Sequence, residues 1–286
     1  MKVITSITEL QHALASYHQE RIALVPTMGC LHEGHLSLIH KAKRLADVVV
    51  VSIYVNPLQF NDSQDLQHYP KPFASDIALC QQAGVDFVFH PDNLYAENPM
   101  QVALHVNTLS QSLCGLHRPG HFDGMITVVN ILFNIVRPDL ALFGEKDFQQ
   151  LSIIRHMIVD LHMPIEIIAG ETVREQDGLA LSSRNQHLTT EQRHQAEFIP
   201  QALQAVIQAF DQGQSLKHCL AAGQDILDTH AITPDYFGIY DEQHLQPVLT
   251  LDADNPIAMR VFIAVKIGTT RLIDNMPLPT QTNKDT

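Results

Sequence analysis

Two histidines three positions apart, His32 and His35, are the side chains in this 286-residue sequence that are best suited to phosphate chemistry. They end the segment Pro26-Thr27-Met28-Gly29-Cys30-Leu31-His32-Glu33-Gly34-His35. Gly34 lets a phosphate approach the backbone closely, and the free amides of a helix starting here would attract an anion. Two imidazoles can donate hydrogen bonds to phosphate oxygens and stabilise charge gained in a transition state. The segment therefore predicts a nucleotide-phosphate site.

Two other interpretations of the histidine pair stay open. The rings could cap the start of the helix, which is a structural role. They could instead bind a metal ion, although no third ligand is evident nearby and a metal site needs three or four. We therefore expect no metal held by the protein at this segment.

Neutral amides follow the apolar run 48–55, where Asn56-Pro57-Leu58-Gln59 stands. Asn56 and Gln59 can both donate and accept hydrogen bonds, so they suit a hydroxy acid better than a phosphate. In isolation the segment is more typical of a turn with surface amides than of a binding site. The same holds for the segment 118–124, which alone predicts a turn before a helix.

Two polar segments carry cations that could contact phosphates. In Gly144-Glu145-Lys146-Asp147, Lys146 is a point charge suited to a phosphate. Asp147 is a good N-cap type, and Gln150 follows three residues later. In Leu181-Ser182-Ser183-Arg184, two hydroxyls and a guanidinium could surround a phosphate group. Taken alone, the first segment is as typical of a charged loop as of a phosphate site, and without the histidine segment the second would be an ordinary polar loop.

The elements that would position these residues alternate between strand and helix. Apolar runs at 22–25, 48–55, 85–89, 140–143 and 165–168 predict buried strands, and helical spacing connects them at 38–46, 77–83, 125–136 and 148–161. Such alternation predicts an α/β domain with a doubly wound, Rossmann-like parallel sheet. The histidine segment follows the first predicted strand, at the edge of the sheet where ligands bind.

The pattern changes after about residue 184. Helices are predicted at 189–210 and 216–227, the first opened by Thr189 and Gln192 at capping-box spacing. Strands are predicted at 236–240, 259–267 and 271–273. We therefore expect two domains, a Rossmann-like domain over 1–175 and a smaller C-terminal α+β domain over 176–286.

Charge and composition exclude several protein classes. The formal net charge is −13, which argues against general nucleic-acid binding because that requires a basic surface. No apolar segment approaches the length of a membrane span, and no apolar core of a signal peptide follows Lys2. The four scattered cysteines form no CxxC pair and predict free thiols in a reduced cytosol.

Taken together, these segments resemble the pantothenate synthetase family, within the superfamily of nucleotidyl-transfer enzymes that carry a His-x-Gly-His motif. The likeness extends from Ile22 to Asn275. It rests on ordered blocks at 25–29, 55–60, 118–122, 143–150 and 177–185, and on the closing block 268–275.

The resemblance implies roles for individual residues. The proposed catalytic residues are His32, His35 and Lys146, and His35 matches the family's assigned proton donor. Gln59 and Gln150 match glutamines that bind pantoate, and Asn56 lies beside the first. The ATP-binding positions are Met28, Gly29, Cys30, Leu31, His32, Glu33, Gly34, His35, Gly144, Glu145, Lys146, Asp147, Val173, Leu181, Ser182, Ser183 and Arg184.

The resemblance also implies the reaction. Pantoate attacks the α-phosphorus of ATP to give pantoyl adenylate and pyrophosphate, and β-alanine then displaces AMP to give pantothenate. It implies Mg²⁺ carried with ATP, a cytoplasmic location and a homodimer. Because an adenylate must be shielded from water, we expect the C-terminal domain to act as a lid. Cys30 and Leu181 depart from the family's usual residues without removing a polar group from the predicted site.

Two rival functions stay open at this point. A nucleotidyltransferase that joins AMP to a phosphorylated acceptor would need cations for the acceptor phosphate, where this sequence offers Gln59 and Gln150. A non-catalytic nucleotide-binding protein would have no need of His35 or Lys146, and both are present.

Overall fold

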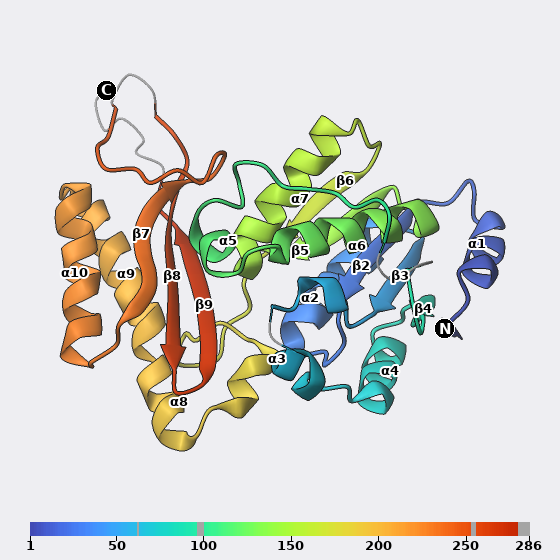
Figure 1. Cartoon of the computed structure of the whole chain (residues 1–286), viewed down its shortest axis with the longest axis horizontal. Coiled ribbons are helices and arrows are strands. Elements are labelled where there is room, and N and C mark those ends of the chain that lie inside the picture. Colours follow the sequence, from blue (N-terminus) through green and yellow to red (C-terminus); the bar gives the residue numbers. More distant parts are fainter. Residues whose placement is uncertain (62, 96–99, 253–255, 280–286) are drawn as a thin grey trace. The chain divides into compact units, whose positions relative to one another are not determined.

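The structure is a computed structural model that describes residues 1–61, 63–95, 100–252 and 256–279. Its internal contacts divide the chain into two compact units (Figure 1). The first unit comprises Met1–Gln111, Arg118–Glu145 and Ile153–Val173. The second comprises Ser112–His117, Lys146–Ser152 and the chain from Arg174 on. The predicted division into a substrate-binding domain, residues 1–175, and a lid domain, residues 176–286, stays a prediction.

In the described part of the first unit, six parallel strands form one sheet in the order β1-β4-β3-β2-β5-β6. The strands are β1 (Lys2–Ile4), β2 (Ile22–Thr27), β3 (Val48–Ile53), β4 (Phe87–Phe89), β5 (Leu140–Gly144) and β6 (Glu166–Gly170). Chain order reverses between β2 and β5, which is the kind of switch point where doubly wound sheets bind ligands.

Helices cover both faces of this sheet, which explains why β3 is apolar and buried at nearly every position. On one face, α2 (Glu33–Leu45) buries Leu38, Ile39 and Ala42 with the inward residues of β2 and β3. On the other face lies α6 (His121–Val136), whose Phe133 meets Phe143 of β5 edge to face. The helix α1 (Ile7–Ala15) packs against α6, and α4 (Phe73–Gln82) contributes Cys80 to the first face.

Parallel pairing brings the carboxyl ends of the central strands to one edge. Thr27, the last residue of β2, pairs with Ile53, the last residue of β3, and β2 also pairs with β5. The segments that follow β2, β3 and β5 therefore start from the same edge of the sheet. This is the edge at which the predicted phosphate and acid segments begin.

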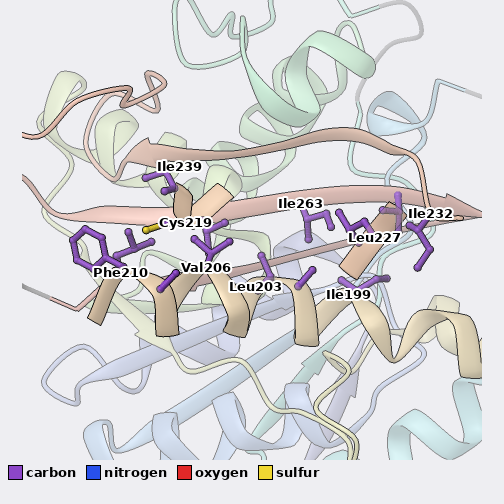
Figure 2. Close-up of a cluster of buried hydrophobic side chains, with 14 of the residues drawn as sticks. Ile199, Leu203, Val206, Phe210, Cys219, Leu227, Ile232, Ile239 and Ile263 are labelled. Carbon is purple, nitrogen blue, oxygen red and sulfur yellow. The ribbon is translucent and has the colours of Figure 1, made fainter. Parts of the chain in front are cut away.

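The second unit has an antiparallel sheet, and within the described residues it contains three strands in the order β7-β8-β9. These are β7 (Pro234–Asp241), β8 (Met259–Ile267) and β9 (Thr270–Pro277). The helices α9 (Phe198–Asp211) and α10 (Leu216–Thr229) pack against it (Figure 1). Figure 2 shows the shared core, in which Leu203 and Val206 of α9 meet Ile263 of β8.

The predicted fold class, a Rossmann-like α/β domain with a smaller α+β part, is confirmed. The capping box at the start of α8 (Thr190–Ala196), made by Thr189 and Gln192, is also confirmed. Three details differ. The strand β1 precedes the one predicted to be first, α6 begins at His121 inside the segment predicted as a turn, and the helix predicted over 189–210 breaks at Glu197.

The remaining helical segments are mostly short, except for α7 with 13 residues. They are α3 (Ser63–His68), α5 (Leu113–His117), α7 (Phe148–Asp160) and the 3₁₀ turns η1 (Pro57–Gln59), η2 (Glu145–Asp147) and η3 (Ser183–His187). Across the described ranges, no helix has both the length and the apolar character needed to cross a membrane.

Candidate active site

The segment after β2 turns sharply through two residues in the left-handed region, Gly29 (φ 82°) and Cys30 (φ 51°). Such a backbone costs little at glycine but is strained at cysteine, so it needs support. Part of that support comes from Thr27, whose hydroxyl accepts the Gly29 N–H at 3.1 Å and donates to the Ser52 carbonyl at 2.7 Å. The turn is thus tied to the ends of both β2 and β3.

A buried carboxylate completes the support of this turn. Asp76, in the first turn of α4 and 1% exposed, accepts the Cys30 N–H at 2.9 Å and the Leu31 N–H at 2.8 Å. A methyl group at position 29 would lie 2.9 Å from this carboxylate. Asp76 therefore holds the strained turn, and the amides of Cys30 and Leu31 are already bonded to it.

The two histidines cap the start of α2. His32 Nδ1 accepts the Gly34 N–H at 3.2 Å, and His35 Nδ1 accepts the His32 N–H at 3.3 Å. The ring centroids are 4.1 Å apart. An Nδ1 that accepts carries no proton, so this arrangement assigns the neutral tautomer with the proton on Nε2 to both rings. Capping and donation to a ligand are therefore compatible, since they use opposite nitrogens.

The neutral amides after β3 lie in a tight turn formed by Asn56 and η1, called here the 56–59 turn. Asn56 is 1% exposed, and its Nδ2 donates to Gln59 Oε1 and to the Gly124 carbonyl, both at 3.0 Å. Gln59 is 8% exposed, and its Nε2 lies 3.1 Å from Met28 Sδ. The structure thus brings Gln59 of the predicted acid site into contact with Met28 of the predicted ATP segment.

The amino end of α6 holds the 56–59 turn in place. A Cβ atom at Gly124 would meet the Leu58 carbonyl at 2.3 Å, so only glycine allows this approach. The Gln59 carbonyl accepts from His121 Nδ1 at 2.7 Å and from Arg118 Nη2 at 3.3 Å. The segment 118–124, which as sequence predicted a turn, therefore supports the predicted acid site.

Of the remaining predicted residues in the first unit, Gly144 ends β5 and Glu145 opens η2, while Val173 is the last residue of the unit. Glu33 is exposed in the first turn of α2. The contact of these residues with a nucleotide stays a prediction.

The predicted residues of the second unit include Lys146, whose ammonium group lies 3.8 Å from the Asp147 carboxylate. Its side chain is 20% exposed. The Lys146 carbonyl accepts from Asn275 Nδ2 at 2.9 Å, and Asn275 Oδ1 accepts from Arg260 at 2.6 Å. The closing block at 268–275 thus anchors the backbone that carries Lys146.

The two neighbouring glutamines at the start of α7 differ in environment. Gln149 is 6% exposed and bonds to the backbone at the start of α5. It accepts from the Cys114 N–H and donates to the carbonyl of Ser112, which precedes the helix, both at 2.9 Å. Gln150 is half-buried. The structure therefore gives Gln149 a structural role and leaves Gln150 as the predicted acid-binding residue.

The loop with the two serines opens η3, where Ser182 Oγ accepts the Arg184 N–H at 3.3 Å. Leu181, Ser182, Ser183 and Arg184 are all half-buried. Upstream, Arg174 forms a bidentate pair with buried Asp274, at 2.6 and 2.9 Å. Burial raises the pKa of Asp274, and the hydrogen bonds from Arg174 oppose that rise.

No group of three or more histidine, cysteine, aspartate or glutamate side chains within the described ranges is placed to hold a metal ion. A magnesium ion that arrives with ATP needs mainly phosphate oxygens and water as ligands. The predicted ATP-binding and acid-binding residues are mainly imidazoles, amides and single cations, which are donors suited to phosphate and hydroxyl oxygens.

Four supporting residues were not predicted as site residues from the sequence: Asp76, Tyr95, Arg118 and His121. Arg118 and His121 belong to a block that the resemblance included without a role. Asp76 looks like an ordinary acidic residue in a first helical turn. Tyr95, whose hydroxyl donates to Asn56 Oδ1, follows no motif. Each acts through a contact across at least 39 positions of the chain, for which local sequence gives no signal.

Comparison with known proteins identifies the family of this chain. The profile of the family "Pantoate-beta-alanine ligase" matches residues 2–277. The pantothenate synthetase of Pseudomonas putida is 45% identical over 282 residues, covering 96% of this chain and 97% of that protein. That of Trichlorobacter lovleyi is 46% identical over 283 residues, covering 97% and 99%.

Solved structures give the same result. The pantothenate synthetase of Thermus thermophilus superposes with a TM-score of 0.91 at 40% identity, covering 98% of this chain and 100% of that one. The pantoate–β-alanine ligase of Francisella tularensis, described as complexed with β-γ ATP and β-alanine, gives 0.81 at 34% identity, covering 97% of each. The chain therefore belongs to the pantoate–β-alanine ligase family.

Proposed function

We propose that the protein condenses pantoate with β-alanine in two ATP-dependent steps. A carboxylate oxygen of pantoate attacks the α-phosphorus of ATP, the bond to the bridging oxygen breaks, and pyrophosphate leaves. The amine nitrogen of β-alanine then attacks the carbonyl carbon of pantoyl adenylate and loses a proton. AMP leaves and pantothenate is released.

The first step brings two anions together, so its barrier depends on offsetting their repulsion. In this proposal His32 and His35 donate from Nε2 to phosphate oxygens, as the neutral tautomers allow. Lys146 and Arg184 supply positive charge, and Ser182 and Ser183 supply hydroxyl donors. Because the imidazoles are neutral donors, charge stabilisation is the role we assign to His35 rather than transfer of a proton.

The acid is recognised by neutral groups. We assign pantoate binding to Gln59 and Gln150, and we assign Asn56 the task of holding Gln59, because both ends of the Asn56 amide are bonded within the protein. The nucleotide contacts proposed besides the residues named above are Met28, Gly29, Cys30, Leu31, Glu33, Gly34, Gly144, Glu145, Asp147 and Val173.

Three accompanying proposals follow from family membership. Mg²⁺ is expected to enter with ATP and to neutralise its phosphates. The protein is expected to work in the cytoplasm and as a homodimer. Sedimentation equilibrium of the purified protein checks the last point, since a mass near twice 32.0 kDa is expected.

The observation that carries the proposal is the pairing of two chemically different groups at one sheet edge. Neutral histidine donors follow β2, and a buried glutamine amide follows β3, joined through the contact between Met28 and Gln59. Phosphate donors next to a neutral amide suit an acid activated by ATP. They do not suit a phosphorylated acceptor, which would need a cation where Gln59 stands.

The experiment that tests the proposal is product analysis with ATP, Mg²⁺, pantoate and β-alanine, leaving out each in turn. Pantothenate and AMP are expected in the full mixture alone. Pyrophosphate formed without β-alanine would identify the adenylate intermediate. Folded protein that makes neither pantothenate nor AMP would refute the proposed function.

A further inference from the structure

The orientation of the Asn56 amide is fixed by two backbone groups. The Gly124 carbonyl can only accept, so the atom of Asn56 at 3.0 Å from it must be Nδ2. The Leu58 N–H can only donate, so the atom 3.2 Å from it must be Oδ1. The two constraints agree, and they leave one hydrogen on Nδ2 and one lone-pair direction on Oδ1.

The remaining hydrogen of Asn56 determines how Gln59 is oriented. It points to Gln59 at 3.0 Å, so the Gln59 atom there must be the acceptor Oε1. Gln59 Nε2 then lies on the far side, towards Met28 Sδ at 3.1 Å. Gln59 is therefore held with its N–H groups, and not its carbonyl oxygen, turned away from Asn56.

Tyr95 bonds to the remaining lone pair of Asn56 Oδ1. Its hydroxyl donates a short hydrogen bond to Asn56 Oδ1, and its ring packs edge to face on Tyr54 with centroids 6.2 Å apart. Burial, and next the neighbouring Tyr54, raise the pKa of Tyr95, so the hydroxyl keeps its proton and stays a donor. With this bond the Asn56 amide has both hydrogens and both lone-pair directions engaged.

We propose that Tyr95 is a positioning residue which, through Asn56, holds Gln59 with its Nε2 turned towards the acid substrate. One hydrogen of this Nε2 bonds to Met28 Sδ, and the other is offered to the acid. The acid must then present a hydrogen-bond acceptor at this point, a carboxylate or hydroxyl oxygen. That the acid is pantoate rests on the proposed function. The orientation of the Gln59 side-chain amide rests on the hydrogen bonds alone.

Two substitutions test this orientation of the Gln59 amide. Tyr95→Phe removes the hydroxyl and keeps the ring, so Gln59 is less firmly oriented, and the KM for pantoate is expected to rise by roughly three- to tenfold. Asn56→Asp removes both hydrogens from the amide, so Gln59 has to turn its own N–H groups towards the new carboxylate. Its oxygen then faces the acid, and the KM for pantoate is expected to rise by at least about tenfold.

The comparison of KM values separates this role from general support of the fold. The KM for ATP and for β-alanine should change less than about twofold in Tyr95→Phe, since its hydroxyl bonds to Asn56, which holds Gln59 of the proposed acid site. Tyr240→Phe, the same change at a half-buried tyrosine of β7, should leave all three values unchanged. Melting temperatures of all variants are measured beside the kinetics.

Wild-type protein is assayed first, and if it makes no pantothenate the proposed function fails on its own. If it does, an unchanged KM for pantoate in Tyr95→Phe overturns the inference, and so does an equal rise of all three KM values. If Asn56→Asp does not fold, the KM for pantoate in Tyr95→Phe still tests the proposed role of Tyr95.

Discussion

At the residue scale, the histidine pair shows how a structural and a chemical role can share one ring. The sequence left helix capping and phosphate binding as alternatives. The structure assigns the capping bonds to Nδ1 of His32 and His35. Since a neutral imidazole with an accepting Nδ1 carries its proton on Nε2, capping sets the tautomer that phosphate donation requires.

The first prediction concerns the two groups proposed to stabilise the transition state. His35→Ala and Lys146→Ala are each expected to lower kcat by at least about a hundredfold, the usual cost of removing one preorganised donor. Circular dichroism should show that both variants remain folded. His40→Ala and Lys217→Ala, at exposed positions on α2 and α10, serve as controls. Near-normal turnover in a folded His35→Ala or Lys146→Ala would refute its role.

A second prediction concerns Asp76, which accepts two amides of the strained turn. In Asp76→Asn one of these N–H groups loses its acceptor and meets an amide NH₂ group. The free energy of unfolding in urea should fall by roughly 1–3 kcal/mol, and the KM for ATP should rise because His32 follows the turn directly. Asp92→Asn, at an exposed position, is the control and should change neither. Unchanged stability and ATP kinetics in Asp76→Asn would contradict the role.

At the element scale, the 56–59 turn depends on a helix that is distant in sequence. The start of α6 packs on the turn through Gly124 and bonds its last carbonyl through His121 and Arg118. The acid site is therefore shaped by the docking of α6 as much as by the end of β3.

The third prediction tests this docking. Gly124→Ala places a methyl group 2.3 Å from the Leu58 carbonyl, so α6 must move away from the turn. Such overpacking should cost roughly 1–3 kcal/mol of unfolding free energy, and the KM for pantoate should rise with it. Asn134→Ala, an exposed change on the same helix, should leave both unchanged. A Gly124→Ala protein with wild-type stability and pantoate kinetics would show that the close approach is unimportant.

The accuracy of the sequence predictions varied with element type for physical reasons. The strands β2, β3 and β5 were predicted because both of their faces are buried, which produces continuous apolar runs. The strand β1 was missed because its three residues are mostly exposed and make no run. The start of α6 was missed because Gly120 and Gly124 favour a turn locally, whereas tertiary packing favours the helix.

At the scale of the whole molecule, the proposed ATP contacts fall in both compact units, with His35 in the first and Arg184 in the second. We expect the C-terminal part, residues 176–286, to close over bound ATP and to shield the adenylate from water. Small-angle scattering should show a smaller radius of gyration with ATP and Mg²⁺ than without. Identical scattering curves would argue against a large closure.

The sequence alone determined the fold class, the family resemblance and the groups proposed to touch substrate. Apolar periodicity reflects burial, and site residues stand in short motifs at strand ends, so both are visible locally. Tertiary structure alone decided the residues that act through others: Asp76 on the strained turn, Tyr95 on Asn56, and Asn275 on Lys146. Their partners lie 39 to 129 positions away, and a hydrogen bond over such a separation leaves no local pattern in the chain.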